Sequence, residues 1–565
     1  MLKFEEYVYE RPILHEEQAT FKVLLKKFTD AQSAEEAIAG TESINAFRNR
    51  LSTLFNLVYI RASIDTKDEF YQKERDYFDE IQPNLKEMTT EFYKELVNSP
   101  YRKNLEKQFG SQLFQLVDNE IKAFSPEIIS LLQKENKLSS EYSKLVASAE
   151  VAFQGETYTL AQLAPFAQNE DREVRRQAVT AYAGFFASHE DQFNSIYDQL
   201  VKVRHEIAGK LGYKNFVEVG YLRMQRIGYN AEMVAAFRKQ VRDYIVPLAT
   251  KLYEKQAARI GVDTLRFYDE SFQFKSGNAK PKGSPEWIIE NGQKMYKELS
   301  NETNEFFHFM LDRNLMDLEA KKGKEAGGYC TFIEDYEAPF IFANFNGTSG
   351  DIDVLTHEAG HAFQVYTSRN LKVPEYVFPT SEAAEIHSMS MEFLTWPWME
   401  LFFKEDTDKY KYSHLADGLQ FLPYGVAVDE FQHLVYDNPD WTPEQRKDAW
   451  RKLEEIYLPH RDYDGNAYLA SGGYWHRQGH IYDIPFYYID YTLAQICAFQ
   501  FWEKSRENHE DTWKDYLNLS KQGGSQSFLN LVKTAKLNSP FEAGTVQAVI
   551  QTIEDWLDSV DDKSL

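Results

Sequence analysis

Two histidines and a glutamate stand close together in the second half of the chain, as His357, Glu358 and His361. On a helix, residues four positions apart lie on one face, so both imidazoles could bind a single Zn²⁺ ion. The carboxylate of Glu358 would then lie beside the metal-bound water and could accept its proton. The sequence therefore predicts a metal site with hydrolytic chemistry.

A catalytic zinc ion needs a third protein ligand and an open position. A third histidine six residues after His361 would complete one known pattern, but Thr367 stands there and excludes it. The segment 379–397 begins with a Pro-Thr-Ser cap and predicts a second helix that could supply the ligand. The candidates on this helix are Glu382, Glu385, His387 and Glu392.

Glu385 and Glu392 are seven positions apart and share a helix face. One of them could bind the metal while the other orients a ligating histidine through a hydrogen bond. Spacing alone favours Glu385 over Glu382 and leaves both open.

The sequence before His357 predicts the strands and the turn that would position these side chains. Two β-prone runs, 329–333 and 339–345, precede it, and the turn-forming segment 346–351 can cap the helix. An edge strand beside such a helix can pair with an extended peptide through its backbone. We therefore expect Ala343, Asn344 and Phe345 to form a substrate-binding edge.

Helical periodicity dominates the rest of the chain. The predicted elements are helices at 46–60, 79–96, 171–186, 191–211, 231–260 and 287–318, a hairpin at 151–159, a loop at 272–287, and mostly helices after 354. We predict an N-terminal helical lobe over 1–180 and a catalytic region over 181–565.

Composition agrees with a large helical protein, because only 27 Gly and 18 Pro occur among 565 residues. The net charge of −25 repels phosphate backbones and anionic lipids, so we expect neither nucleic acid nor membranes as partners. The two cysteines, Cys330 and Cys497, make no disulfide framework, and the N-terminus has no leader pattern. We expect a reduced cytoplasmic protein, and nothing in the sequence specifies an oligomeric state.

Two runs together carry a family resemblance: Ala343-Asn-Phe-Asn-Gly followed by the His357–His361 motif, and Glu385-Ile-His-Ser388 with Glu392, 24 residues later. They resemble the thimet oligopeptidase and oligoendopeptidase F family of zinc peptidases, in particular its bacterial oligoendopeptidase or Pz-peptidase branch. The resemblance implies one Zn²⁺ per chain with Glu385 as third ligand. His387 stands where several relatives carry proline and is a lesser alternative.

A second block, residues 471–491, is similar to the histidine and tyrosine segment of that family. Relatives use such residues to hold the scissile carbonyl and its developing negative charge. The resemblance points to His480, with Tyr482 and Tyr488 as the first tyrosines and Tyr491 behind them.

The same resemblance implies a mostly α, zincin-like fold with two helical lobes around a deep channel and a small sheet beside the metal-binding helix. It implies a zinc oligoendopeptidase that cleaves internal bonds of short unstructured peptides, with Glu358 as general base. The alternative is an exopeptidase, a carboxypeptidase or dipeptidase, which needs a charged clamp such as Arg369 or Arg477. A structural zinc site, a serine hydrolase and a P-loop ATPase lack their motifs.

Overall fold

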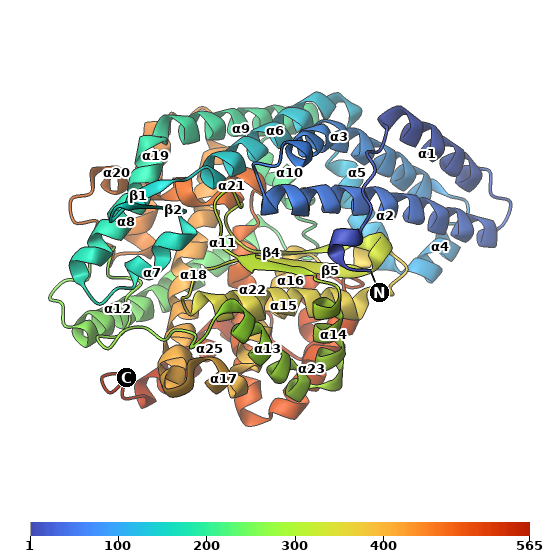
Figure 1. The fold of residues 1–565 in the computed structure, drawn as a ribbon. Coiled ribbons are helices and arrows are strands. Elements are labelled where there is room, and N and C mark those ends of the chain that lie inside the picture. Colours follow the sequence, from blue (N-terminus) through green and yellow to red (C-terminus); the bar gives the residue numbers. More distant parts are fainter. Residues whose placement is uncertain (1) are drawn as a thin grey trace.

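The computed structural model describes residues 2–565 and is mostly helical, as the composition predicts. A layer of N-terminal helices lies at the top of Figure 1. These helices are α1 (Leu14–Thr29), α2 (Ala34–Ile64), α3 (Glu69–Asn98), α4 (Arg102–Phe109), α5 (Ser111–Lys122) and α6 (Ile129–Ala147). The two amphipathic segments predicted at 46–60 and 79–96 are confirmed as parts of α2 and α3.

The predicted hairpin is present as β1 (Val151–Phe153) and β2 (Glu156–Tyr158), which pair antiparallel. Gly155 turns between them with a φ of +86°, which only glycine adopts without strain. The predicted helices 171–186 and 191–211 are confirmed as α8 (Arg172–Ser188) and α9 (Glu190–Lys210). The predicted helix 231–260 is α11 (Ala231–Gln240) and α12 (Val246–Ile260), joined by a π-helical turn, Val241–Ile245. Two short helices were not predicted, α7 (Ala164–Ala167) and α10 (Phe216–Arg223).

The predicted helix 287–318 is wrong as a single element. It divides into α13 (Pro285–Leu299) and α14 (Asn301–Asp312), and strand β3 (Met316–Glu319) follows. The break occurs because Ser300 caps α14: its hydroxyl accepts from the Thr303 amide, and the Thr303 side chain accepts from the Ser300 amide. This reciprocal cap satisfies backbone groups that a continuous helix would use internally.

The two strongest β-prone runs are confirmed as β4 (Tyr329–Ile333) and β5 (Ala338–Phe345). The sheet order is β3-β5-β4, with β5 parallel to β3 and antiparallel to β4. The expectation that Ala343–Phe345 forms an edge is therefore wrong, because β5 is the central strand. Its nearly unbroken apolar sequence is typical of a strand buried on both faces.

Three helices pack beneath this sheet in Figure 1: α15 (Gly350–Ser368), α16 (Ser381–Leu394) and α22 (Tyr488–Glu507). α15 and α16 approach closely at Gly360, where a Cβ atom would lie 2.7 Å from both the His387 carbonyl oxygen and the Ser388 Cα. Only glycine fits this crossing without moving the helices, which explains a residue of low helix propensity inside α15.

The remaining helices complete the fold. They are α17 (Glu400–Phe403), α18 (Thr407–Asp437), α19 (Pro443–Tyr457), α20 (Ala467–Ala470), α21 (Gly479–Asp483), α23 (His509–Gln522), α24 (Phe528–Thr534) and α25 (Thr545–Ser559). One hydrophobic core runs from Phe4 to Leu557, so N-terminal and C-terminal helices share it. The division at residue 180 stays a prediction. Across residues 2–565 no helix has the length and apolarity to span a bilayer.

Candidate active site

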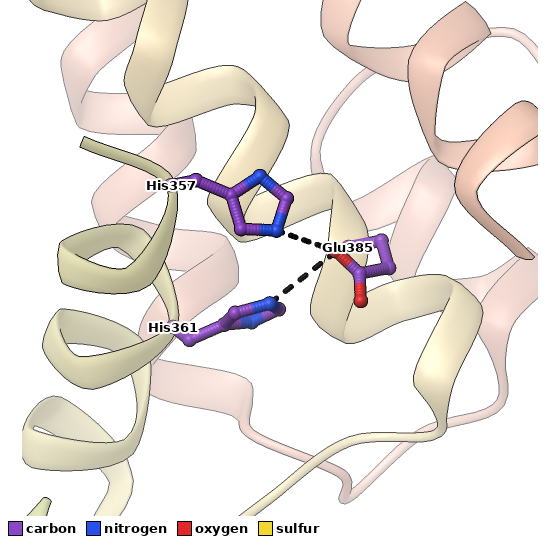
Figure 2. Close-up of side chains that lie close together, drawn as sticks. All are labelled: His357, His361 and Glu385. Atoms are coloured by element: carbon purple, nitrogen blue, oxygen red, sulfur yellow. Dashed lines mark ion pairs between the residues drawn. The ribbon is translucent and has the colours of Figure 1, made fainter. Parts of the chain in front are cut away.

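Helices α15 and α16 bring His357, His361 and Glu385 together (Figure 2). Oε2 of Glu385 lies 3.2 Å from Nε2 of His357 and 3.3 Å from Nε2 of His361. One nitrogen or oxygen of each side chain lies within 4.8 Å of the others. Two imidazoles and one carboxylate converging on one point, from two buried helices, form a donor set suited to a divalent metal such as zinc.

Hydrogen bonds outside this group orient its members. Nδ1 of His357 lies 2.7 Å from Oε1 of Glu392, which leaves Nε2 free as a metal donor. The Ser388 hydroxyl donates to Oε2 of Glu385 at 2.8 Å. Burial alone would raise the pKa of the Glu385 carboxyl, but His361 and His357 hold that pKa well below its usual range. The residues present therefore fit a metal ion.

The two alternative ligands on α16 lie elsewhere. The carboxylate of Glu382 accepts a hydrogen bond from the Tyr229 hydroxyl at 2.9 Å. The ring of His387 is fully buried, with Nδ1 3.3 Å from the Ser520 hydroxyl. Neither side chain belongs to the group that could hold the metal.

A histidine that the sequence did not single out supports Glu392. Nε2 of His414, on α18, lies 2.8 Å from Oε2 of Glu392, and the Trp396 indole donates to Nδ1 of His414 at 3.1 Å. Both oxygens of Glu392 are therefore engaged, one with His357 and one with His414. No local sequence pattern indicates a role for His414, because it lies 22 residues after Glu392 on another helix.

Glu358 is buried beside the three donors, and its Oε2 has no hydrogen-bond partner within residues 2–565. Burial raises the pKa of its carboxyl above the ordinary value. Gly328 leaves room for it, because a Cβ there would lie 3.2 Å from Oε1 of Glu358. A buried carboxylate of raised pKa, with one free oxygen, is suited to exchange protons.

His480 lies in the same region, with Nε2 3.1 Å from the Tyr491 hydroxyl. Its Nδ1 lies 2.8 Å from Nε2 of Gln478, and Oε1 of Gln478 accepts from the Tyr424 hydroxyl. The Gln478 amide thus donates to Nδ1, which places the His480 proton on Nε2. Burial lowers the pKa of His480 to about 4, so at neutral pH the ring is an uncharged donor. The Tyr488 ring packs 5.1 Å from it.

Tyr482 is a core residue, contrary to the expectation from the resemblance. Its side chain is fully buried and stacks on Tyr142 with ring centroids 3.9 Å apart. It belongs to the short helix α21, only two residues after His480, where neighbouring side chains do not share a face.

The sequence did not single out Tyr487, although this residue directly contacts the candidate metal site. Its hydroxyl donates to Oε1 of Glu385, so both carboxylate oxygens of Glu385 are constrained. The only available signal was its place beside Tyr488 in a tyrosine-rich segment.

β3 and β4 are the two edge strands of the sheet, and β4 is the edge that packs against α15. The Phe332 carbonyl accepts from the Asn56 side chain of α2 at 2.8 Å and so points away from β5. Strand backbones alternate in direction, so Cys330 points to the same outer side. The residues of β5 that were predicted to bind substrate already form hydrogen bonds within the protein. The Ala343 carbonyl accepts from the Lys324 ammonium, and the Asn344 side chain donates to the carbonyls of Glu325 and Gly327.

A cavity of about 850 Å³ lies on this outer side of β4. Its walls come from α2, α3 and α6, from Thr331 and Glu334, and from Asp483 and Ile484. A second cavity of about 510 Å³ shares Thr331 and Glu334 with it.

The two candidate clamp arginines lie in different places. Arg369 follows α15, lines the second cavity and donates to the Tyr366 carbonyl. Arg477 lies three residues before His480 and donates to the Tyr474 hydroxyl.

Comparisons with known proteins agree with this geometry. The model of the peptidase M3 N-terminal domain matches residues 4–124, and that of peptidase family M3 matches residues 166–550. An oligoendopeptidase F homolog of Borreliella burgdorferi is 25% identical over 382 residues, which is 66% of this chain and 62% of the relative. The matched part thus spans less than two thirds of the length of that curated relative.

Solved structures match along the whole chain. A structure of Pz peptidase A with an inhibitor is 60% identical, with a TM-score of 0.99 over 99% of this chain and 100% of the other. A candidate oligoendopeptidase F of Bacillus anthracis is 56% identical, with a TM-score of 0.95 over 100% of both chains. A family model that covers most of the chain, together with these structures, shows that the chain belongs to peptidase family M3.

Proposed function

We propose that the protein is a zinc-dependent oligoendopeptidase that hydrolyses internal bonds of short peptides. The observation that carries this proposal is the convergence of His357, His361 and Glu385 beside the buried carboxylate of Glu358. Membership of family M3 and the similarity to Pz peptidase A support it. A cytoplasmic location stays a prediction.

Zn²⁺ held by the three side chains would supply Lewis acidity toward a water molecule and the scissile carbonyl. Glu358 accepts the proton of the attacking water at its free oxygen and delivers it to the leaving amine. Burial raises the pKa of Glu358, which favours the protonated form that this second step requires.

The developing negative charge on the carbonyl oxygen needs hydrogen-bond donors that are already oriented. We assign this role to Nε2–H of His480 and to the hydroxyl of Tyr491, which lie 3.1 Å apart, with Tyr488 as a further candidate. Gln478 and Tyr424 hold the His480 tautomer that can donate. Tyr487 acts through Glu385 as a positioning residue.

The outward backbone of Cys330 on β4, together with the amide of Phe332, whose carbonyl is bound by Asn56, replaces the predicted segment of β5 as the proposed substrate edge. An extended peptide can pair there through main-chain hydrogen bonds, which give affinity with little sequence demand. The cavity beyond β4 has room for a few residues of an unfolded peptide, and its helical walls disfavour folded proteins.

Digestion of a peptide mixture, followed by mass spectrometry, tests this function. We expect internal cleavage of short peptides, loss of activity after chelation, and recovery with Zn²⁺. An internally quenched peptide blocked at both ends separates the endopeptidase from the exopeptidase, because only the endopeptidase cleaves it. A zinc-loaded protein that cleaves no peptide of any length would contradict the proposal.

A further inference from the structure

Phe486, in the turn between α21 and α22, has a left-handed backbone with a φ of +68°. Within residues 2–565, seven other non-glycine residues have a positive φ, and all seven are polar and at least partly exposed. Phe486 differs because its aromatic side chain is fully buried. A bulky side chain disfavours this conformation, so it persists only where the surrounding contacts impose it, which is typical of functional sites.

Both backbone groups of Phe486 are bound by side chains from distant segments. Its amide donates to Oε1 of Gln432, on α18, at 2.7 Å. Its carbonyl accepts from Nη2 of Arg226, shortly after α10, at 2.5 Å. The same nitrogen of Arg226 lies 2.8 Å from Oδ1 of Asp490, in the first turn of α22. Arg226 and Gln432 are both buried, so water competes little for these hydrogen bonds.

Contacts also fix the side chain of Phe486. The centre of its ring lies 5.0 Å from that of His433 and 5.5 Å from those of Tyr221 and Tyr436. Gly220 leaves space for the ring, because a Cβ there would lie 2.4 Å from a ring carbon. The turn is thus fixed at an amide, a carbonyl and a side chain by residues of α10, of α18 and of the segment after α10.

Tyr487 directly follows Phe486, so the turn decides whether Tyr487 reaches the candidate metal site. The Tyr487 hydroxyl donates to Oε1 of Glu385, on α16. The φ of Phe486 sets the direction in which the chain enters Tyr487, because only φ and ψ rotate between consecutive peptide planes. A return of Phe486 to a negative φ would therefore displace the Tyr487 hydroxyl from Glu385.

We propose that Arg226 and Gln432 are positioning residues of the active site: by holding Phe486 in its left-handed conformation, they keep the Tyr487 hydroxyl on Glu385. This inference rests on the proposed peptidase function and extends the set of residues on which that function depends. Hydrogen bonds to a ligating carboxylate keep it in the orientation that a metal ion requires, and their loss commonly weakens metal binding by about 10- to 100-fold. Arg226 and Gln432 therefore act on metal affinity through Tyr487, although they bind Phe486 and not Glu385.

A double-mutant cycle on zinc affinity tests this chain of contacts. Arg226→Gln and Gln432→Met are made singly and in a Tyr487→Phe background, and zinc affinity is measured by competition with a chromogenic chelator. Gln432→Met keeps the size of the side chain but removes the acceptor for the Phe486 amide. In the wild-type background we expect each change to weaken zinc binding by about 10-fold. In the Tyr487→Phe background the loss should be less than about threefold, because the hydrogen bond that these residues support is already absent.

Kinetics provide a second measurement. In the zinc-saturated enzyme we expect Arg226→Gln to lower kcat for an internally quenched peptide, with KM almost unchanged, since the substrate edge on β4 is not altered. Arg226→Lys keeps a donor and the positive charge, so it should restore part of both zinc affinity and kcat. A role in overall stability alone would leave kcat of the folded enzyme unchanged.

Arg175→Gln is the matched control. Arg175, on α8, is also buried, pairs with Asp269 at 2.9 Å and donates to the Asn169 carbonyl at 2.8 Å. Like Arg226, it binds one carboxylate and the backbone of a distant or preceding segment. Its replacement should lower the melting temperature, whereas zinc affinity and kcat, measured well below that temperature, should stay those of the wild type.

Zinc affinity decides between the outcomes. A loss of affinity that depends on Tyr487 supports the proposal. Wild-type affinity in both Arg226→Gln and Gln432→Met, or equal losses with and without Tyr487→Phe, overturns it. If Arg226→Gln does not fold, Gln432→Met gives the same test alone. These measurements need no turnover, so a wild type that binds zinc and cleaves no peptide would contradict the peptidase function while the zinc affinities still decide this inference.

Discussion

At the scale of single residues, the site depends on the contrast between Glu358 and Glu385. Both carboxylates are buried within one small volume, but Glu385 is surrounded by imidazoles and hydroxyl donors, whereas one oxygen of Glu358 has no partner within residues 2–565. Opposite environments move the two pKa values in opposite directions, Glu385 down and Glu358 up. One carboxylate is thereby suited to bind a cation and the other to transfer protons.

Glu358→Gln tests the proton-transfer role. The amide keeps the size of the side chain but cannot accept and return a proton, so we expect kcat to fall by at least about 10²-fold. Zinc content, measured by elemental analysis, should stay near one per chain because the three metal donors remain. An active variant would contradict the assignment. Glu173→Gln, at an exposed carboxylate on α8, should change neither quantity.

At the scale of elements, the candidate metal site depends on how closely α15 and α16 cross. The ligands come from both helices, and Gly360 allows the backbone of α16 to approach α15 at the level of His361. A strand could not replace α15, because residues four positions apart also share a face in a strand but lie about 13 Å apart, too far for both histidines to bind one ion.

Gly360→Ala tests this crossing. The added Cβ would meet backbone atoms at 2.7 Å, which cannot move as a flexible side chain could. We expect a loss of about 1–3 kcal/mol in stability and a weaker affinity for zinc. The matched control is Gly184→Ala in α8, where a Cβ meets nothing within 4 Å and helix propensity should add stability. If Gly360→Ala and Gly184→Ala had equal effects on the melting temperature and on the zinc affinity, this role for the helix crossing would be contradicted.

At the scale of the whole molecule, a buried ion-pair network connects the N-terminal helices to the His480 segment. Glu135 on α6 lies 2.7 Å from Arg204 on α9 and 2.9 Å from Arg223 on α10. Arg204 also donates to the carbonyls of Ile481 and Tyr482. The network joins residues far apart in sequence around the segment that carries His480.

The pH dependence of stability tests this network. Burial opposes ionisation of Glu135, but Arg223 and Arg204 overcome it and lower its pKa from 4.5 to about 2. The stabilisation is therefore present above pH 4.5 and is lost as the pH falls toward 2; it amounts to about 3 kcal/mol. Glu135→Gln should lower the melting temperature at pH 7, and its gap to the wild type should narrow in acid.

A gap that stays constant from pH 7 to pH 3 would contradict this role for Glu135. Glu173 serves again as the matched control, because its ion pair with Arg176 is exposed and contributes little to stability.

Interactions between residues close together in the sequence determine most of the helices and the positions of the candidate metal donors along them. Helical periodicity places His357, Glu358 and His361 without knowledge of the rest of the fold, and the Pro-Thr-Ser start signal before α16 predicts a second helix that carries Glu385. The β-prone runs located β4 and β5 because branched and aromatic residues favour extended backbone. These features depend on interactions between residues a few positions apart.

Tertiary structure alone decided which strand is the edge, which tyrosines face the site, and which carboxylate and arginine have partners. β4 is the edge beside α15 because β3 pairs with the other side of β5. Tyr487 contacts Glu385 and Tyr482 does not, because the turn between α21 and α22 redirects the chain. The sequence thus determined the donors and the helix that carries two of them. Their surroundings arise from contacts between segments that no local pattern relates.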